Sequence, residues 1–424
     1  MKNFKESGIE WLGEIPEHWE VVKINKIVTF VNGYAFENFD FNPIFEIPVI
    51  RIGDMQKEKI LYDNCLKTKE KEKLKQFLIS NNDILIALSG ATTGKIAFCD
   101  TDNKAYINQR VAIVRSKLKL VKYYFLTRGF SLLIELACNG SAQPNISTKE
   151  IGEFKIPLPP LKEQEQIANF LDEKCKKIAN FIEKKEKLIT LLKEQKQALI
   201  NETITKGLDK NINFKDSGIE YLGEIPQHWK LVRLGLILKT SSGTTPDSGN
   251  DKYYKGGQIV WINSGDLNDG FLKDSKRKIT QDALDDYSVL KIFDKDSLIV
   301  AMYGATIGKT AILKVNACVN QACCVLEKSA WYNTFYLFYL FNRYKKELIS
   351  MGSGGGQPNI SQDIIKNLKI PLPPLKEQEQ IANFLDEKCK KIDLLIEKTE
   401  KQIKLIKEYK ITLTNQAVCG RINL

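Results

Sequence analysis

The chain has 424 residues, 43% of them apolar, so it can bury sizeable cores, and this composition excludes an intrinsically disordered protein. It carries 63 basic residues against 52 acidic ones, a formal net charge of +11, which favours a polyanionic partner such as nucleic acid. A lysine-rich composition without nucleic-acid binding explains the charge equally well, so the charge alone does not establish a nucleic-acid partner.

The sequence shows no sign of secretion or membrane insertion. The first residues are polar and charged, and no run approaches the roughly 20 apolar residues of a membrane span. Nine cysteines follow no framework spacing, which favours a reducing, cytoplasmic location. Cys318, Cys323 and Cys324 lie in an apolar strand-like run and are expected to pack rather than to bind zinc.

The first element of the chain occurs twice. Residues 4–24 read FKESGIEWLGEIPEHWEVVKI, and residues 214–234 read FKDSGIEYLGEIPQHWKLVRL. Each copy holds one of the only two histidines, His18 and His228, directly before a tryptophan. A catalytic histidine is one interpretation, but a capped turn that packs the tryptophan is favoured.

A strand-rich region follows each copy, from Val21 to Phe154 and from Leu231 to Leu368. Short apolar runs broken by Gly, Asn and Asp predict strands, and each region ends in a predicted helical piece. We therefore expect two mixed α+β globular domains. The predicted strands lie at Ile47–Ile52, Ile84–Ala87, Val111–Val114, Ile259–Ile262, Leu298–Met302 and Ala322–Leu326, and the helical pieces at Lys122–Cys138 and Thr334–Ser350.

The two halves differ most in one place. Residues 30–80 and 240–290, here called the insert segments, share almost nothing, although their flanks match. A constant frame around two different inserts predicts one fold that presents two different recognition surfaces.

A glycine-rich turn is also repeated, as GATTGK at residues 90–95 and GATIGK at residues 304–309. A phosphate-binding Walker loop needs four residues between its first glycine and the Gly-Lys pair, followed by Ser or Thr. Here three residues intervene, and Ile96 follows Lys95, so nucleotide hydrolysis is not expected. A tight strand–turn–strand and a loop that contacts a phosphate remain equally good interpretations.

A long helix is predicted after each domain. Residues 155–178 and 369–392 are the same 24 residues, KIPLPPLKEQEQIANFLDEKCKKI, and their prolines predict an extended segment that leads into the helix. A helix of about 40 residues is about 60 Å long, more than one small domain needs. The apolar residues predicted to pack the helix pair are Ile167, Leu171, Ile178, Phe181, Leu188, Leu192, Ile381, Leu385, Ile392, Leu395, Ile406 and Tyr409.

We expect the two helices to pair as an antiparallel coiled coil, giving a pseudo-two-fold internal repeat. The alternatives are that each helix folds back onto its own domain, or that the pair only mediates dimerisation. Identity of the exposed Lys, Glu and Gln in the 24-residue block argues against the first alternative. The predicted segments are a first domain at 1–155, a central helix at 156–210, a second domain at 211–369 and a C-terminal helix at 370–424.

These features together resemble the DNA-specificity subunit of type I restriction–modification systems. The resemblance rests on GIEWLGEIPEHW from Gly8 and GIEYLGEIPQHW from Gly218, on QPNIS at residues 143–147 and 357–361, and on IPLPPLKEQEQIANFLDEK from Ile156 and Ile370. It covers the whole chain. It implies that each domain is a target recognition domain that reads one part of a split DNA sequence. The helices would then set the spacing and dock two methyltransferase subunits.

Catalytic motifs are missing from the sequence. It has no Asp/Asn/Ser-Pro-Pro-aromatic motif of amino-methyltransferases, no glycine-rich turn suited to S-adenosylmethionine and no nuclease carboxylate–lysine cluster. The chain is therefore interpreted as a non-enzymatic recognition component without cofactor or metal. By the resemblance its partners are double-stranded DNA, the methyltransferase subunits and, through the complex, restriction subunits.

Candidate DNA contacts come from polar, basic and aromatic residues of the two domains. A lysine-rich helix face at Lys67–Lys75 is a further candidate for the DNA backbone, and an ordinary solvated surface explains it too. The leading alternative for the whole protein is a structural coiled-coil adaptor whose globular domains bind protein. The predicted contacts are Arg51, Lys95, Gln109, Arg110, Tyr253, Tyr254, Lys255, Ser264, Lys309 and Gln321.

Overall fold

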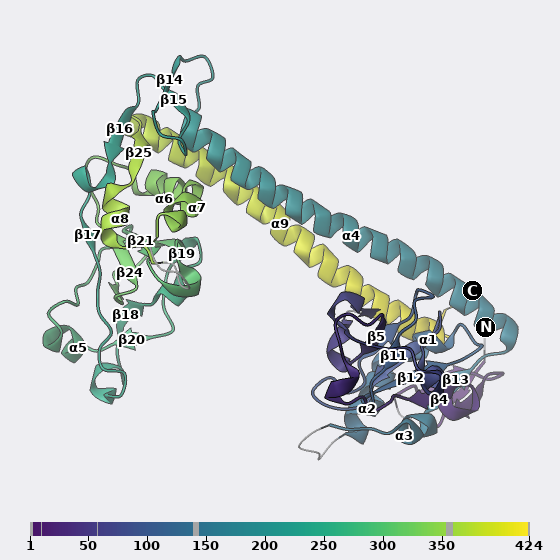
Figure 1. The fold of residues 1–424 in the computed structure, drawn as a ribbon. Coiled ribbons are helices and arrows are strands. Elements are labelled where there is room, and N and C mark those ends of the chain that lie inside the picture. The colour runs from purple at the N-terminus through teal and green to yellow at the C-terminus, as the bar shows by residue number, and fades with distance from the viewer. Residues whose placement is uncertain (1–2, 10, 57, 139–143, 353–358, 423–424) are drawn as a thin grey trace. The chain divides into compact units, whose positions relative to one another are not determined.

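The computed structural model describes residues 3–9, 11–56, 58–138, 144–352 and 359–422, and the chain divides into two compact units (Figure 1). The first unit comprises residues 1–185 and 401–424, and the second comprises residues 186–400. Two long helices, α4 (Leu161–Lys206) and α9 (Leu375–Val418), contribute to both units. Each unit therefore joins one globular α+β domain to parts of both helices.

The first domain holds thirteen short strands and three short helices among its described residues. Its main sheet has the order β10-β9-β12-β4, and a smaller sheet has the order β11-β5-β8. The elements are β1 (Phe4–Glu6), β2 (Glu14–Pro16), β3 (Glu20–Lys23), β4 (Thr29–Asn32), β5 (Ile47–Ile50), β6 (Met55–Gln56), β7 (Lys59–Ile60), β8 (Leu66–Thr68), β9 (Ile84–Ala87), β10 (Ile96–Phe98), β11 (Tyr106–Ile107), β12 (Val111–Arg115), β13 (Lys155–Leu158), α1 (Val121–Tyr124), α2 (Arg128–Ala137) and α3 (Thr148–Glu153).

The central strands of the main sheet of the first domain, β9 and β12, are buried on both faces because they are apolar almost throughout, whereas the edge strand β4 is partly exposed. Ile84 and Ile86 of β9 face the core beneath α1, α2 and the start of α4. Leu85 of the same strand and Ile113 of β12 face the opposite core, toward the smaller sheet. Successive side chains of a strand point to opposite faces, so one continuous apolar run fills two cores.

The second domain is built in the same way. Its main sheet has the order β17-β24-β21-β22-β19, and a smaller sheet has the order β20-β18-β23. The elements are β14 (Phe214–Asp216), β15 (Glu224–Pro226), β16 (Lys230–Arg233), β17 (Thr240–Ser241), β18 (Ile259–Ile262), β19 (Gly270–Leu272), β20 (Lys278–Ile279), β21 (Leu298–Ala301), β22 (Thr310–Leu313), β23 (Cys318–Val319), β24 (Cys323–Leu326), β25 (Lys369–Leu372), α5 (Gln281–Asp286), α6 (Thr334–Arg343), α7 (Lys345–Ser350) and α8 (Gln362–Asn367).

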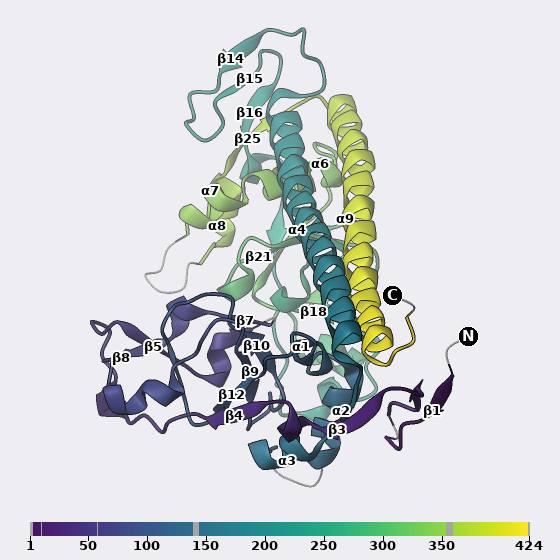
Figure 2. The same cartoon turned by 90° about the vertical axis from the view of Figure 1, so that its right-hand side faces the viewer.

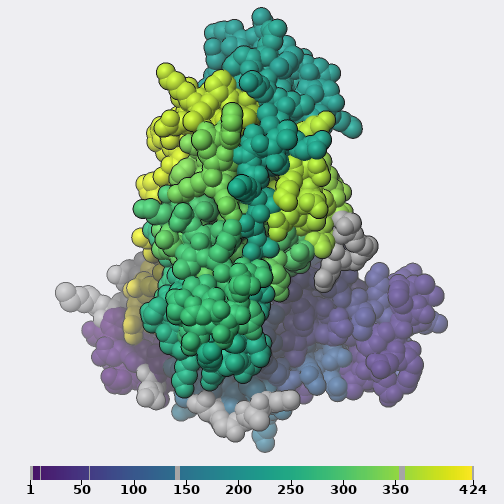
Figure 3. All heavy atoms as spheres, turned by 90° about the vertical axis from the view of Figure 1, so that its left-hand side faces the viewer, coloured from purple at the N-terminus to yellow at the C-terminus, as the bar shows by residue number. Residues whose placement is uncertain are grey.

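The two domains share topology even where their sequences differ. Strand β11 pairs with β5 in parallel, as β23 pairs with β18. The insert segments therefore supply corresponding strands β5 and β18, but they also differ, since β19 of the second joins the main sheet whereas β6 and β7 of the first form a separate strand pair. Figure 3 shows one face of the second unit, where the 240–290 segment, coloured teal to green, covers much of the lower part. The predicted cysteine packing is confirmed, since Cys318, Cys323 and Cys324 are fully buried.

Each domain is attached to its helix by a short strand pair and a polar anchor. Strand β13 pairs with β3, and β25 pairs with β16, so the predicted extended proline segments are edge strands. In the first unit, Trp19 Nε1 donates to Glu163 Oε2 at 3.0 Å, and His18 Nε2 lies 2.6 Å from Glu163 Oε1. The second unit repeats both contacts. The favoured turn that packs the tryptophan is thus confirmed, because Trp19 is 1% exposed.

The second copy of the anchor joins His228 and Trp229 to Glu377. The distances to Glu377 are 2.9 Å from His228 Nε2 and 3.0 Å from Trp229 Nε1. A glycine with positive φ follows the C-terminal end of each long helix. Gly207 follows α4 and lies against Trp229, and Gly420 follows α9 and lies against Trp19. A Cβ at either glycine would come within 3.1 Å of the buried indole, at Gly420 it would also clash with Pro16 at 2.5 Å, and the positive φ would strain the backbone.

The two long helices pack against each other in antiparallel fashion within each unit (Figures 1 and 2). In the first unit, Leu171 near the start of α4 shares a core with Leu413 near the end of α9. In the second unit, Ile200 near the end of α4 shares a core with Leu385 near the start of α9. Of the residues predicted to pack, Ile167, Leu171, Ile178, Ile381, Leu385 and Ile392 are buried, while Leu192 and Ile406 are half-buried.

Four residues that we expected in the helix seam are exposed instead. From Ile178 the seam continues four residues on, at Ile182, rather than three residues on, at Phe181. The sequence offers an apolar residue at both positions, so periodicity alone cannot select the register. Phe181 therefore lies on the exposed flank of the helix. The four exposed side chains are Phe181 (39%), Leu188 (39%), Leu395 (50%) and Tyr409 (50%).

Candidate nucleic-acid interface

The predicted contacts Gln109 and Arg110 lie together on an exposed turn of the first domain. The turn joins β11 to β12, and Val111 N donates to Asn108 O at 2.8 Å to close it. The backbone of Gly33 packs directly against this turn, since a Cβ at Gly33 would come within 2.1 Å of Asn108 O. The turn borders an open polar hollow of about 760 Å³, whose other lining residues include Asn145. Close packing therefore fixes the backbone while both side chains stay exposed.

The GATTGK turn borders the same hollow. Gly90 N donates to Pro144 O, and Ile146 N donates to Leu88 O, both at 2.9 Å, so this turn is tied to the QPNIS loop. The strand–turn–strand interpretation is confirmed, because the turn joins β9 to β10. Lys95 is half-buried at its end, and its contact with a phosphate stays a prediction. Gln143 and Gln357 of the two QPNIS motifs lie outside the described residues.

Arg51 is already engaged within the first domain. Its guanidinium donates to Asp54 Oδ2 at 3.1 Å and to Asn64 O at 3.2 Å, and Asp54 is only 3% exposed. The hydrogen bond that Arg51 donates to the Asp54 carboxylate raises the pKa of Arg51 above its ordinary value. Arg51 would have to leave its ion pair with Asp54 to contact a base. The sequence alone could not reveal this ion pair.

The predicted lysine-rich helix face at Lys67–Lys75 is wrong. Residues Leu66–Thr68 form β8, and a 3-10 helix covers only Glu72–Phe77. The lysines are spaced two residues apart, a period typical of a strand with one exposed face and not of one face of a helix. Most of these lysines remain exposed.

In the second domain, Tyr253, Tyr254 and Lys255 lie on one loop, as their order requires. Tyr254 OH donates to Pro246 O at 2.6 Å, and the Tyr253 ring packs edge-on against Tyr287 with centroids 5.2 Å apart. Both tyrosines are half-buried, whereas Lys255 is exposed. The aromatic side chains thus stabilise the loop, and the lysine is its outward group.

A basic run that the sequence reasoning missed lies beside this loop. Residues 273–278 read KDSKRK, and Arg277 O accepts from Trp261 N while Thr280 N donates to Tyr253 O. Burial raises the pKa of Tyr254, and the nearby positive charge of Arg277 opposes that rise. The density of lysine and arginine in this short segment was the available signal.

The other predicted contacts of the second domain lie on separate turns. Gln321 is exposed on the turn between β23 and β24, and its Oε1 accepts from Thr245 Oγ1 at 2.7 Å. Ser264 begins a 3-10 turn after β18, and Lys309 ends the GATIGK turn before β22. Gln321 corresponds to Gln109 of the first domain, since both follow the asparagine of matching turns.

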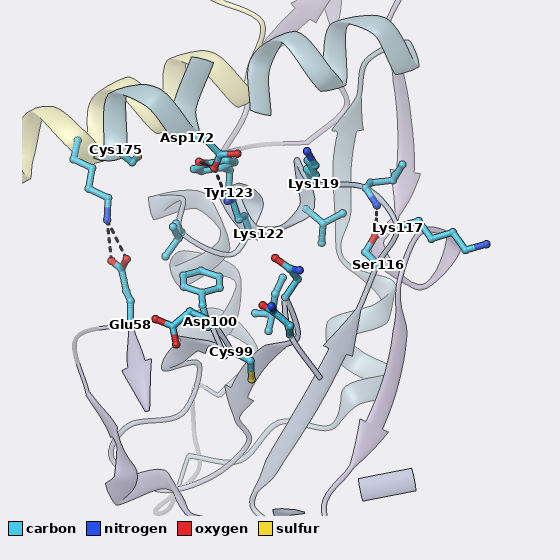
Figure 4. A pocket seen from close by; sticks show the side chains of 18 residues that line it. Glu58, Cys99, Asp100, Ser116, Lys117, Lys119, Lys122, Tyr123, Asp172 and Cys175 are labelled. Atoms are coloured by element: carbon cyan, nitrogen blue, oxygen red, sulfur yellow. Dashed lines mark hydrogen bonds and ion pairs between the residues drawn. The ribbon is translucent and has the colours of Figure 1, made fainter. Parts of the chain in front are cut away.

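A second hollow, of about 730 Å³, lies at the joint of the first domain and its helices (Figure 4). There Asp172 of α4 accepts hydrogen bonds from Lys122 and Tyr123, and Lys410 of α9 lies 3.0 Å from Glu58. Partial burial would raise the pKa of Asp172, but the bonds from Lys122 and Tyr123 outweigh it and hold that pKa below its usual value. These pairs fix the domain on the helices.

The described residues also bear on metal and membrane sites. No group of three or more His, Cys, Asp and Glu side chains among them could hold a metal ion. Within the same residues, no helix is long and apolar enough to cross a membrane.

Comparison with known proteins places the chain clearly. A family model described as the type I restriction modification DNA specificity domain matches residues 16–202 and 226–405. A putative type I restriction enzyme MjaX specificity subunit of Methanocaldococcus jannaschii is 29% identical, over 100% of this chain and 97% of its own. The EcoBI specificity subunit of Escherichia coli is 23% identical, over 91% of this chain and 82% of its own.

Solved structures support the same fold. A chain from a study of complex assembly in the type I R-M system superposes with a TM-score of 0.74 at 18% identity, covering 96% of this chain and 99% of that one. The HsdS subunit of Thermoanaerobacter tengcongensis superposes with a TM-score of 0.53 at 16% identity, covering 96% and 98%. At these identities the likeness shows the fold alone.

Proposed function

Because this chain belongs to the type I restriction–modification DNA-specificity family, we propose that it recognises a bipartite, asymmetric DNA sequence, one half-site per domain. The observation that carries the proposal is the matching topology of the two domains around insert segments that differ. Two frames with the same fold and different loops suit two half-sites of different sequence. Lysines would contact phosphates and set position, while exposed turns would read base edges.

Catalysis would belong to partner subunits, as in a specificity subunit. The exposed apolar side chains on the flanks of α4 and α9, such as Leu395 and Tyr409, support docking of methyltransferase subunits there. The pseudo-two-fold repeat and the identical 24-residue block favour two such subunits, with restriction subunits joining through the complex. The nine cysteines, all free, suit a reducing cytoplasm.

The recognition proposal is tested by mapping methylated adenines across the genome of cells that express the chain with its neighbouring methyltransferase. The intact chain should direct methylation to a split motif. Deletion of residues 21–154 should remove the dependence on one half-site, and deletion of residues 231–368 should remove the dependence on the other. Methylation that does not change between the intact chain and cells without it would refute the proposal and favour the adaptor.

Docking is tested separately with variants on the helix flank. Leu395→Ser combined with Tyr409→Ser should weaken co-purification with the methyltransferase and leave the melting temperature nearly unchanged, since both side chains are half exposed. Ile392→Ser, in the seam and 9% exposed, is the matched control that should lower the melting temperature. Unchanged co-purification of the double variant would exclude this flank as the docking surface.

A further inference from the structure

The arginines of this chain fall into two groups that the sequence does not distinguish. Arginine is suited to base recognition, because its planar fork donates two hydrogen bonds at once. There are eight arginines in the sequence. In five of them the guanidinium already bonds within the protein, to a carboxylate or to a backbone carbonyl. These are Arg51, Arg115, Arg128, Arg343 and Arg421.

The remaining three are Arg110, Arg233 and Arg277. Among the residues that the structure describes, none of these three has a side-chain hydrogen bond or an ion pair, and all three are exposed. Arg233 ends β16, the framework strand that pairs with β25 beside the helix junction. Arg110 instead lies on a turn that both domains share, at a position where only the side chain differs, and Arg277 lies in an insert segment. Apart from Arg233, each domain therefore carries, among its described residues, one unpaired arginine at a position where the other domain has a different residue.

Arg110 extends from the turn that the two domains have in common. Both turns are closed alike, by Val111 N on Asn108 O in the first domain and by Cys323 N on Asn320 O in the second. The next-to-last residue of the turn is Arg110 in one domain and Ala322 in the other. The backbone thus presents this position in the same way, while only the first domain places a guanidinium there.

Arg277 takes a different place in the second domain. Its backbone is fixed, because Arg277 N donates to Ser275 Oγ and Arg277 O accepts from Trp261 N, both at 3.3 Å. The residue precedes β20, beside the loop of Tyr253 and Tyr254, and that loop differs entirely from its counterpart in the first domain. A fixed backbone with a free guanidinium is preorganised for contact with a ligand.

We propose that Arg110 and Arg277 are base-reading residues, each contacting a guanine in the major groove of its own domain's half-site. Bidentate donation to guanine O6 and N7 is the commonest specific contact in DNA recognition. This inference rests on the proposed function and names the specificity residue of each domain. The two domains then read their half-sites from different positions of the same fold.

The test compares Arg110→Ala, Arg277→Ala and Arg233→Ala in cells that also express the methyltransferase, with methylation mapping as the readout. Arg110→Ala should relax the motif at one guanine of one half-site, with discrimination there falling about 5-fold to 150-fold. Arg277→Ala should do the same in the other half-site. Arg233→Ala is the matched control, because Arg233 is also exposed and, within the described residues, has no side-chain hydrogen bond or ion pair, and it should leave the motif unchanged.

Arg110→Lys keeps the charge but loses the fork, so it should also relax that position, which separates base reading from phosphate binding. The protein level and melting temperature of each variant should match those of the unchanged chain. A uniform loss of methylation with the motif intact would overturn the inference, because it indicates a backbone contact. If the unchanged chain directs no motif, the proposed function itself fails, and this outcome is distinct from an unaltered motif in the arginine variants.

Discussion

Replacing Glu163 tests how each domain is held on its helix. Glu163 of α4 accepts from Trp19 Nε1 at 3.0 Å and lies 2.6 Å from His18 Nε2. Glu163→Ala would leave the N–H of a tryptophan that is 1% exposed without this acceptor. A hydrogen bond to a charged group contributes about 1.5–3 kcal/mol. The contact with His18 adds little, because the His18 side chain is 48% exposed and solvent screens the pair.

We therefore expect Glu163→Ala to lower the stability of the first unit by about 2 kcal/mol. For a unit of roughly 200 residues this corresponds to about 4–8 °C in melting temperature. Glu163→Gln keeps one acceptor oxygen and should lose about half as much. Thermal unfolding measures the size of the effect, and hydrogen exchange of amides in the first unit shows where it acts.

The matched control is Glu165→Ala. Glu165 is two residues away on the same helix and exposed, and within the described part of the chain it has no side-chain hydrogen bond or ion pair. Glu377→Ala should repeat the effect in the second unit, where Trp229 and His228 make the same contacts. If Glu163→Ala and Glu165→Ala melt at the same temperature, the anchor does not hold the domain and the reasoning is refuted.

Three further predictions concern the joints, the packing and the spacing. Asp172→Asn should destabilise the chain at pH 7, because the lowered pKa of Asp172 gives stability that is present above its ordinary pKa of about 4 and lost as the pH falls through the folded value. The melting temperatures of the unchanged chain and the variant should therefore differ at pH 7 and approach each other as the pH is lowered toward about 3. Asp386→Asn is the control and should change little at either pH, because the Asp386 carboxylate accepts only from Lys390 on its own helix among the hydrogen bonds of the described residues. Gly129→Ala should cost about 1–3 kcal/mol by denaturant unfolding, since its Cβ would come within 1.9 Å of the Trp11 ring, while Gly265→Ala, with open space around it, should cost far less. One heptad inserted in both long helices lengthens each by about 10 Å and should widen the gap of the methylated motif by about three base pairs without changing the half-sites.

The repeated frame could be predicted from the sequence because it is written twice. The apolar runs predicted strands such as Ile259–Ile262, and the prolines predicted the extended segments before the long helices. The residue composition after those prolines predicted the helices themselves. The register of the helix pair could not be derived with equal certainty. Phe181 and Ile182 are both apolar, and only packing against the partner helix selects Ile182 for the seam.

The residues that we propose to read bases were harder to predict, because their availability depends on partners distant in the chain. Arg51 and Arg110 look alike in the sequence, yet the first bonds Asn64 thirteen residues on, and the second has no such partner in the described part of the chain. The frame explains why this difference matters. A fold that holds the same turn in both domains can change its target by changing one exposed side chain, such as Arg110 against Ala322, without disturbing a core. Specificity then resides in the few side chains that the framework leaves unpaired, and stability resides in those that it pairs.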